Sequence, residues 1–239
     1  MKRFTQVAGF GSKKIGAMAV AVVVVALTVF WFIRTNSSAG PLSNERQHGL
    51  RVVQSREKVK GYERDCGSGK GCVFGKAWTD DHEGTGGKNG CSTRDDVLAL
   101  SGTKVVKDGK CTVSKAEVID AYSGDKIAFE RGQRPTKIDI DHIYPLSRAW
   151  DMGASRWTDQ RRVQFANDID RNLVAAGASA NREKGDKGLA EWLPSNTKYR
   201  KDYVCQYAQV TDAYDLVITK DEAKVVGQHC PDWKNWKKK

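Results

Sequence analysis

The sequence comprises 239 residues, with 40 Lys and Arg residues against 29 Asp and Glu residues and a formal net charge of +11. This length fits one domain of ordinary size with appendages. It contains no internal repeat, P-loop or GxSxG motif, and nothing in it indicates an organic cofactor. The basic balance allows a polyanionic partner without requiring one, and oligomeric state is not encoded in any recognisable pattern.

Residues 1–34 carry five basic residues and no acidic residue, and they include the 19-residue apolar run Ile15–Ile33. The run is long for a signal peptide and about right for a membrane span. Four of the five cations precede it, so the positive-inside rule places the N-terminus in the cytoplasm and the rest outside. A cleavable signal is the alternative, because Ser37-Ser38-Ala39 resembles a signal peptidase site. We therefore expect an extracytoplasmic protein, either anchored through this N-terminal helix or secreted.

All six cysteines follow the apolar run, at Cys66, Cys72, Cys91, Cys111, Cys205 and Cys230. An even number of cysteines beyond an export signal indicates disulfides. Order along the chain predicts the pairs 66–72, 91–111 and 205–230, out of 15 possible pairings. A zinc site is disfavoured because no CxxC spacing occurs.

The remaining chain divides into a linker over 35–60, a domain over 61–230 and a basic tail over 231–239. The linker ends in an expected short helix over 54–60, and a glycine-rich loop over 61–90 follows it. Short strands are predicted at 103–106, 112–113, 126–129, 137–142 and just after 170. Helices are predicted at 91–100, 146–168, after Ser179, 199–210 and 220–227. Aromatic and cationic residues alternate in the tail, which suits either a solvated end or a contact with nucleic acid.

A set of polar residues begins with the last two residues of the strand at 137–142, and their side chains suit one reaction. His142 can take a proton from water, because a free imidazole titrates near pH ~6.5. Asp141 and Asn181 can supply oxygen ligands to a hard cation such as Mg²⁺, with Mn²⁺ as the alternative. Asn172 can hydrogen-bond backbone across the loop and fix His142. Adjacent strand residues point to opposite faces, so we expect the strand to bend at Asp141-His142.

These residues resemble the HNH, or ββα-metal (His-Me finger), nucleases, and especially the HNH-type domain of secreted actinobacterial proteins. The likeness rests on seven segments: Tyr62–Asp65, Asn89–Leu98, Ile140–Ser147, Phe165–Asp168, Arg171–Leu173, Asn181–Asp186 and Trp192–Pro194. Two of these segments, around Asp141-His142 and Asn181-Arg182, are also similar to the HNH domain of RNA-guided CRISPR nucleases.

The resemblance implies an α+β fold, with a ββα-metal nuclease core, added helices and short strands, and disulfide staples. It implies His142 as general base, Asp141 and Asn181 as metal ligands, and Asn172 as the orienting residue. Two departures stand out: position 181 is asparagine rather than histidine, and 30 residues separate His142 from Asn172. An inserted helix must therefore pack aside.

The leading hypothesis is an exported, metal-dependent endonuclease that cuts DNA, or RNA, with low sequence specificity. Arg182 and Lys184 are candidate phosphate contacts, and Arg94 is either another or a structural salt bridge. The alternative is a non-catalytic surface protein that binds DNA or an anionic polymer. A toxin-like effector nuclease is a third reading of the same residues.

Overall fold

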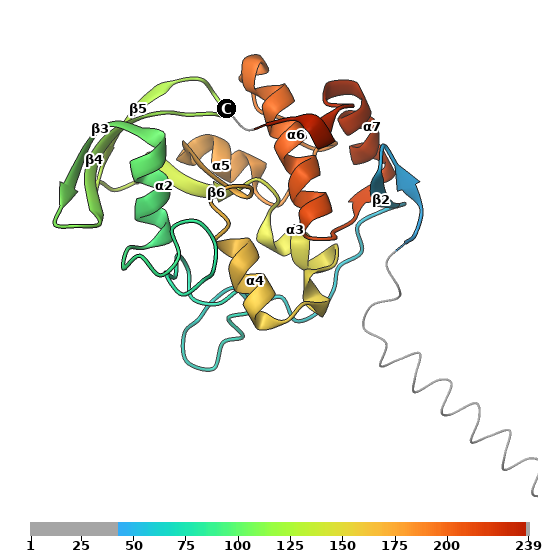
Figure 1. Ribbon diagram of the computed structural model, residues 1–239, viewed down its shortest axis with the longest axis horizontal. Helices are drawn as coiled ribbons and strands as arrows, with labels where there is room; N and C mark the ends of the chain where they lie inside the picture. The colour runs from blue at the N-terminus through green and yellow to red at the C-terminus, as the bar shows by residue number, and fades with distance from the viewer. Residues whose placement is uncertain (1–42, 238–239) are drawn as a thin grey trace, which may run out of the picture. The chain divides into compact units, whose positions relative to one another are not determined.

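The computed structural model describes residues 43–237, and its elements mix helices with three small sheets (Figure 1). The strands are β1 (Arg46–Gln47), β2 (Leu50–Val53), β3 (Gly102–Asp108), β4 (Thr112–Ile119), β5 (Lys126–Glu130), β6 (Ile138–His142), β7 (Leu173–Gly177) and β8 (Ile218–Thr219). The helices are α2 (Thr93–Ser101), α3 (Leu146–Asp151), α4 (Asp159–Ala166), α5 (Ala178–Lys184), α6 (Thr197–Ala213) and α7 (Lys220–His229), with 3-10 turns η1 (Ala154–Arg156) and η2 (Trp233–Asn235). The predicted α+β class is confirmed.

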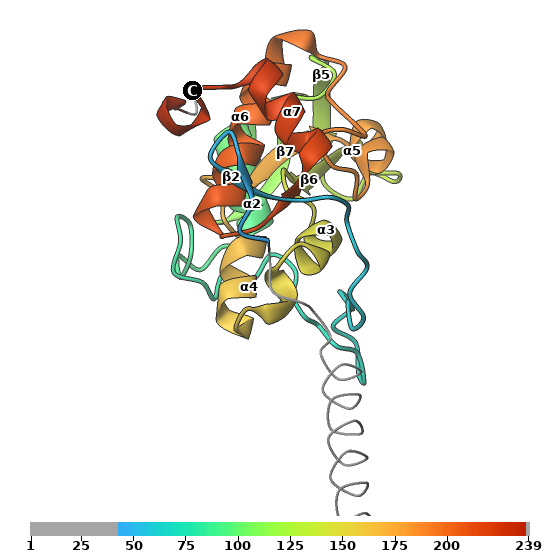
Figure 2. The same cartoon turned by 90° about the vertical axis from the view of Figure 1, so that its right-hand side faces the viewer.

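The antiparallel pair β6–β7 lies between two hydrophobic cores. Ile138 and Ile140 of β6 face a smaller core built from α2, β4 and β5. Ala176 of β7 faces a larger core that holds the side chains of α3, α4, α6 and α7. Both views show α3 and α4 on one side of the pair and α6 and α7 on another (Figures 1 and 2). Because strand residues alternate between faces, successive side chains of β6 point toward the two cores in turn.

Helix α5 follows β7 directly and packs against both strands of the pair. The order strand, strand, helix is therefore the predicted one. The 30-residue interval between His142 and Asn172 forms α3, η1 and α4, which pack beside the pair as the predicted insertion. Helix α5 begins at Ala178, with Gly177 at its N-cap position and no side-chain cap, so Ser179 lies inside the helix that the sequence predicts to follow it.

Part of the segment expected as a linker belongs to the fold. Strand β2 pairs in parallel with β8, and its Leu50 and Val52 are buried in the larger core. Residues 54–60 form no helix, so the helix predicted there is wrong. Trp233 in the expected basic tail is buried, and its indole nitrogen donates to the carbonyl of His48. This tryptophan therefore serves packing rather than base stacking.

Three disulfides join Cys66 to Cys72, Cys91 to Cys111, and Cys205 to Cys230, which confirms the predicted pairing. The third lies in the larger core and ties α6 to the end of α7. The predicted anchor at 1–34 lies outside the described residues. Within residues 43–237, no helix combines the length and apolarity that a membrane crossing needs.

Candidate active site

Asp141 and His142 face opposite sides of β6. The β6–β7 ladder runs without a register shift up to the pair His142–Leu173, so the bend predicted at this point is wrong. The imidazole of His142 stacks on the indole of Trp78, with ring centroids 5.6 Å apart. The carboxylate of Asp141 points the other way and accepts a 2.6 Å hydrogen bond from the Tyr122 hydroxyl. The two residues therefore meet different neighbours.

His142 is held in the tautomer that a general base requires. Its Nε2 lies 2.9 Å from the carbonyl oxygen of Ala166. A carbonyl can only accept, so Nε2 carries the proton and Nδ1 keeps a free lone pair. Burial, and secondarily the charge of Arg64, lowers the pKa of His142 to about 3. The imidazole is therefore neutral at physiological pH.

Asn172 closes the loop that follows β6. Its side-chain oxygen accepts from the Tyr144 amide at 2.9 Å, and its side-chain nitrogen donates to the Phe165 carbonyl at 3.2 Å. Its backbone carbonyl accepts from the amide of Ile143 at 2.8 Å. The backbone hydrogen bonds expected of Asn172 are therefore present. They tie together the residues that follow His142 and those that precede Ala166.

Asp141 has a cationic partner inside the fold. The Lys184 ammonium lies 2.9 Å from its Oδ2 and also donates to the His142 carbonyl at 2.8 Å. Burial and the nearby carboxylate of Asp141 raise the pKa of Tyr122 well above its ordinary value, so its hydroxyl stays a donor. Lys184 is fully buried, which corrects its prediction as a phosphate contact. It serves instead as the counter-ion of Asp141.

The predicted metal ligands do not fit a divalent cation in this arrangement. Asn181 donates through Nδ2 to Asp139 at 3.2 Å, so its amide is oriented toward a different carboxylate from that of Asp141. The Lys184 ammonium and the Tyr122 hydroxyl both contact Oδ2 of Asp141, so this carboxylate already has a cation and a hydrogen-bond donor as partners. No cluster of three His, Cys, Asp or Glu side chains suited to a metal occurs in residues 43–237. Asp141 and Asn181 therefore do not form the predicted Mg²⁺ site here.

The two predicted arginines lie apart from His142. Arg94 donates to the carbonyl of Ile138 at 3.1 Å, and burial lowers its pKa, so its contact is structural. Arg182 is exposed at the edge of a cavity of about 650 Å³ between β5 and α5. That cavity does not include His142. The predicted site residues are thus distributed over both faces of the β6–β7 pair.

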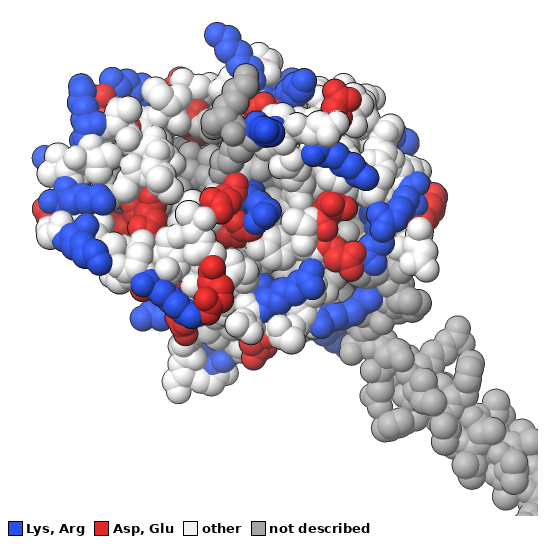
Figure 3. Space-filling view, viewed as in Figure 1, with Lys and Arg blue, Asp and Glu red and all other residues white. Residues whose placement is uncertain are grey.

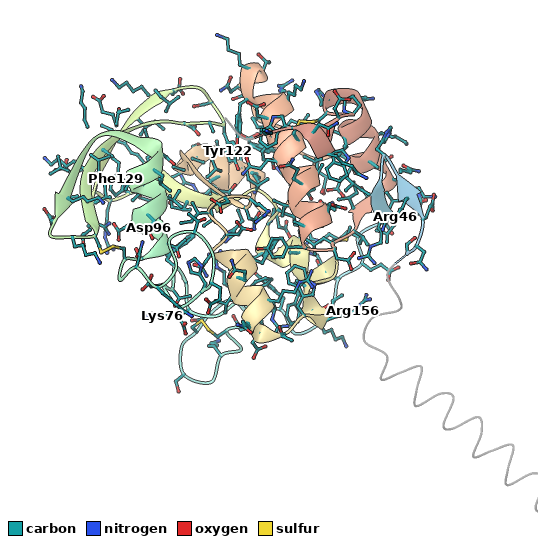
Figure 4. All side chains as sticks on the ribbon, viewed as in Figure 1. Arg46, Lys76, Asp96, Tyr122, Phe129 and Arg156 are labelled. Carbon is teal, nitrogen blue, oxygen red and sulfur yellow. A yellow bond between two sulfur atoms is a disulfide. The ribbon has the colours of Figure 1, made fainter. Side chains whose placement is uncertain are left out.

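Three residues beside His142 were not predicted as site residues. The side chains of Arg64, Trp78 and Asn167 line a small pocket together with the imidazole. Arg64 and Asn167 belong to segments of the family likeness, but their nearness to His142 depends on how the loop over 61–90 folds back. No spacing rule in the sequence indicates that return. Figure 4 shows Lys76, of the same pocket, and Tyr122, the partner of Asp141, on opposite sides of the β6–β7 pair.

Comparison with known proteins places these elements in a family. Residues 98–237 match the family described as GmrSD restriction endonucleases, C-terminal domain. The chain belongs to this family. An uncharacterized secreted protein of Arthroderma benhamiae is 36% identical over 133 residues, which cover 55% of this chain and 63% of that relative. The match thus spans less than two thirds of the relative, and no solved structure matches the chain.

The GmrSD C-terminal match includes β6, β7 and α5, and with them Asp141, His142, Asn172 and Lys184. It begins within α2, so the loop over 61–90 lies before it. The residues that approach His142 from that loop, Arg64 and Trp78, are therefore supplied from outside the matched domain.

Proposed function

We propose that the protein is an exported endonuclease that hydrolyses phosphodiester bonds of DNA, or of RNA, with low sequence specificity. The observation that carries the proposal is the state of His142 within a family of endonuclease domains. The imidazole is neutral, its Nε2 is fixed on a backbone carbonyl, and its Nδ1 is left to accept a proton. General base catalysis of this kind contributes about 10²- to 10⁴-fold to a rate.

A polyanionic substrate suits the charge of the chain and the surroundings of His142. After residues 1–34, 35 basic residues stand against 29 acidic ones. Figure 3 shows Lys and Arg spread over the viewed face with acidic residues among them, rather than one patch of a single sign. The charge of Arg64 contributes to the low pKa of His142. A phosphate bound beside Arg64 offsets that charge and so removes the smaller of the two main contributions to the low pKa, while burial, the larger one, remains.

The order β6, β7, α5 supports a place for this domain among the ββα-metal nucleases, with His142 as the base and Asn172 as the orienting residue. The HNH resemblance implies dependence on a divalent metal, but Asp141, paired with Lys184, is not available as a ligand for such an ion. Asn181 and Arg182, on the α5 side, remain candidate contacts for a longer substrate.

Export is supported by the three disulfides and by the secreted relative, since disulfides persist in oxidising compartments. We propose the apolar run at 15–33 as its signal or anchor, and residues 61–230 as the nuclease domain. The chain before residue 61 then contributes β1 and β2 as an edge of that domain.

The test is cleavage of plasmid DNA and of single-stranded RNA by residues 40–239 with disulfides intact, in Mg²⁺, in Mn²⁺ and in EDTA. We expect cleavage by the wild type and a loss of at least about 100-fold in His142→Ala. His82→Ala is a matched control, because His82 is also buried but bonds Thr93 away from His142. Equal cleavage by the wild type and His142→Ala contradicts the proposal. Binding without cleavage under every condition supports a non-catalytic binder of nucleic acid instead.

A further inference from the structure

A small pocket adjoins the imidazole of His142 on the face away from Asp141. Its walls are residues 74–78 with Arg64, His142, Leu146, Ala166 and Asn167, and we call it the His142 pocket. Its volume is about 10 Å³. A cavity of roughly 10–15 Å³ is the smallest that admits one water molecule. The pocket is therefore of a size for one water and no larger ligand.

Asn167 presents an unpartnered acceptor at this pocket. Its side chain is 1% exposed, and its Nδ2 donates to the Val163 carbonyl at 2.9 Å. That bond fixes which end of the amide is oxygen. The Oδ1 atom has no hydrogen-bond partner among the described residues. A buried acceptor without a partner costs about 1–3 kcal/mol, so a polar ligand is favoured there.

Two cations line the exposed side of the pocket. Arg64 and Lys76 are exposed, and the side chains of both make no hydrogen bond or ion pair with another residue in 43–237. The loop that carries them is held in place at three points. The Cys66–Cys72 disulfide closes it, Phe74 is buried in the larger core, and Arg162 donates to the Val73 carbonyl at 2.6 Å. The two charges are therefore presented by an anchored segment.

We propose that the His142 pocket holds the attacking water between Asn167 Oδ1 and His142 Nδ1, and that Arg64 and Lys76 bind the scissile phosphodiester beside it. This inference rests on the endonuclease function proposed above. The two hydrogens of one water satisfy the two acceptors, which leaves an oxygen lone pair for the phosphorus.

The chemistry balances within these groups and solvent. The water oxygen forms a bond to phosphorus while the bond from phosphorus to the leaving ester oxygen breaks. The proton of the water passes to His142 Nδ1, and the leaving oxygen takes a proton from solvent. Arg64 and Lys76 lie where negative charge accumulates on the phosphoryl oxygens, and such fixed charges stabilise the transition state.

The first test replaces the acceptor. We expect Asn167→Ala to lower kcat by about 10- to 100-fold with KM unchanged, because the water loses its position and the substrate keeps its contacts. Asn167→Asp retains an acceptor oxygen and recovers part of that kcat. Asn196→Ala is the control: it removes a helix cap distant from the pocket and lowers the thermal midpoint without lowering kcat. An Asn167→Ala enzyme with wild-type kcat overturns the assignment of the water.

The second test removes the cations. Binding of a short DNA duplex is measured across salt concentrations in the His142→Ala background, where no cleavage interferes. Arg64→Gln with Lys76→Gln weakens binding and lowers the salt slope by about two, one for each phosphate contact. Arg156→Gln with Lys107→Gln removes the same charge from exposed positions outside the pocket and changes the slope less. Equal slopes for the two double variants overturn the phosphate assignment.

The outcomes separate the two proposals. If the wild type and His142→Ala leave DNA equally intact, the endonuclease function itself is wrong. If the wild type cuts, His142→Ala does not, and the Asn167 and Arg64–Lys76 variants behave as wild type, then only the assignment of this pocket is wrong.

Discussion

Replacing Lys184 with methionine tests how the two faces of β6 are organised. The ammonium is fully buried, pairs with Asp141 at 2.9 Å and donates to the His142 carbonyl at 2.8 Å. Methionine has similar length but no charge, so Asp141 keeps only the Tyr122 hydroxyl as its partner. Removing one member of a buried ion pair costs about 3–5 kcal/mol, because the remaining charge is left without compensation.

Urea unfolding of the isolated domain measures this change, and a thermal scan gives an independent value. At about 2–4 °C per kcal/mol for a domain of this size, the midpoint falls by roughly 6–20 °C. The double variant Asp141→Asn, Lys184→Met also removes the unpaired carboxylate charge, and it regains most of the free energy of unfolding that Lys184→Met loses. A Lys184→Met protein within 1 kcal/mol of the wild type would refute the reasoning, because Asp141 would then have another source of neutralisation.

Three further outcomes follow from the same contacts. The pKa of His142 in the folded chain, about 3, lies below its unfolded value, so the unfolded chain binds more protons between pH 6.5 and 3. The stability that neutral His142 contributes is therefore fully present above pH 6.5 and falls by up to about 1.4 kcal/mol per pH unit below it. In urea titrations across that range, His142→Phe removes this contribution and makes the pH dependence shallower. Cys205→Ala with Cys230→Ala removes a buried disulfide between cysteines 25 residues apart and lowers the free energy of unfolding by about 3 kcal/mol. Cys66→Ser with Cys72→Ser lowers that free energy by less but weakens DNA binding. Calorimetric titration of Mg²⁺ shows no binding at Asp141 in the wild type, while Lys184→Ala gains it.

Local patterns in the sequence were enough to predict much of this fold. The cysteines pair in chain order as predicted, and helices α2 and α7 form close to the predicted ranges 91–100 and 220–227. Strands β1, β2 and β8 escaped prediction because they have two to four residues each. Strand β8 is a strand only through its long-range parallel pairing with β2, and β1 only through its short antiparallel pairing with β2.

The candidate site was less predictable because neighbouring side chains of β6 meet partners on opposite faces of the β6–β7 pair. Alternation along β6 sends Asp141 and His142 to opposite faces, and a shared metal site for both therefore requires the bend predicted from the sequence. The regular ladder keeps the alternation and sends Asp141 to the side of α5. The counter-ion of Asp141 is Lys184. Lysine is almost never fully buried unless it is paired, so the sequence alone favours a surface position for this residue. Burial of such a residue depends on tertiary packing, which no local pattern carries.

The Lys184–Asp141 pair also sets a quantitative limit on the metal-dependent reading. A divalent ion at Asp141 must displace an ammonium whose removal costs about 3–5 kcal/mol, which weakens its affinity by roughly 10²- to 10³·⁵-fold. Proteins that bind Mg²⁺ through one or two carboxylates also rely on phosphate oxygens of a substrate as ligands. Asp141 alone therefore does not make up for this loss of affinity. If Mg²⁺ binds Lys184→Ala but not the wild type, then the lysine, rather than the position of the carboxylate, imposes the limit. If neither protein binds Mg²⁺, the orientation of Asn181 toward Asp139 is the stronger obstacle.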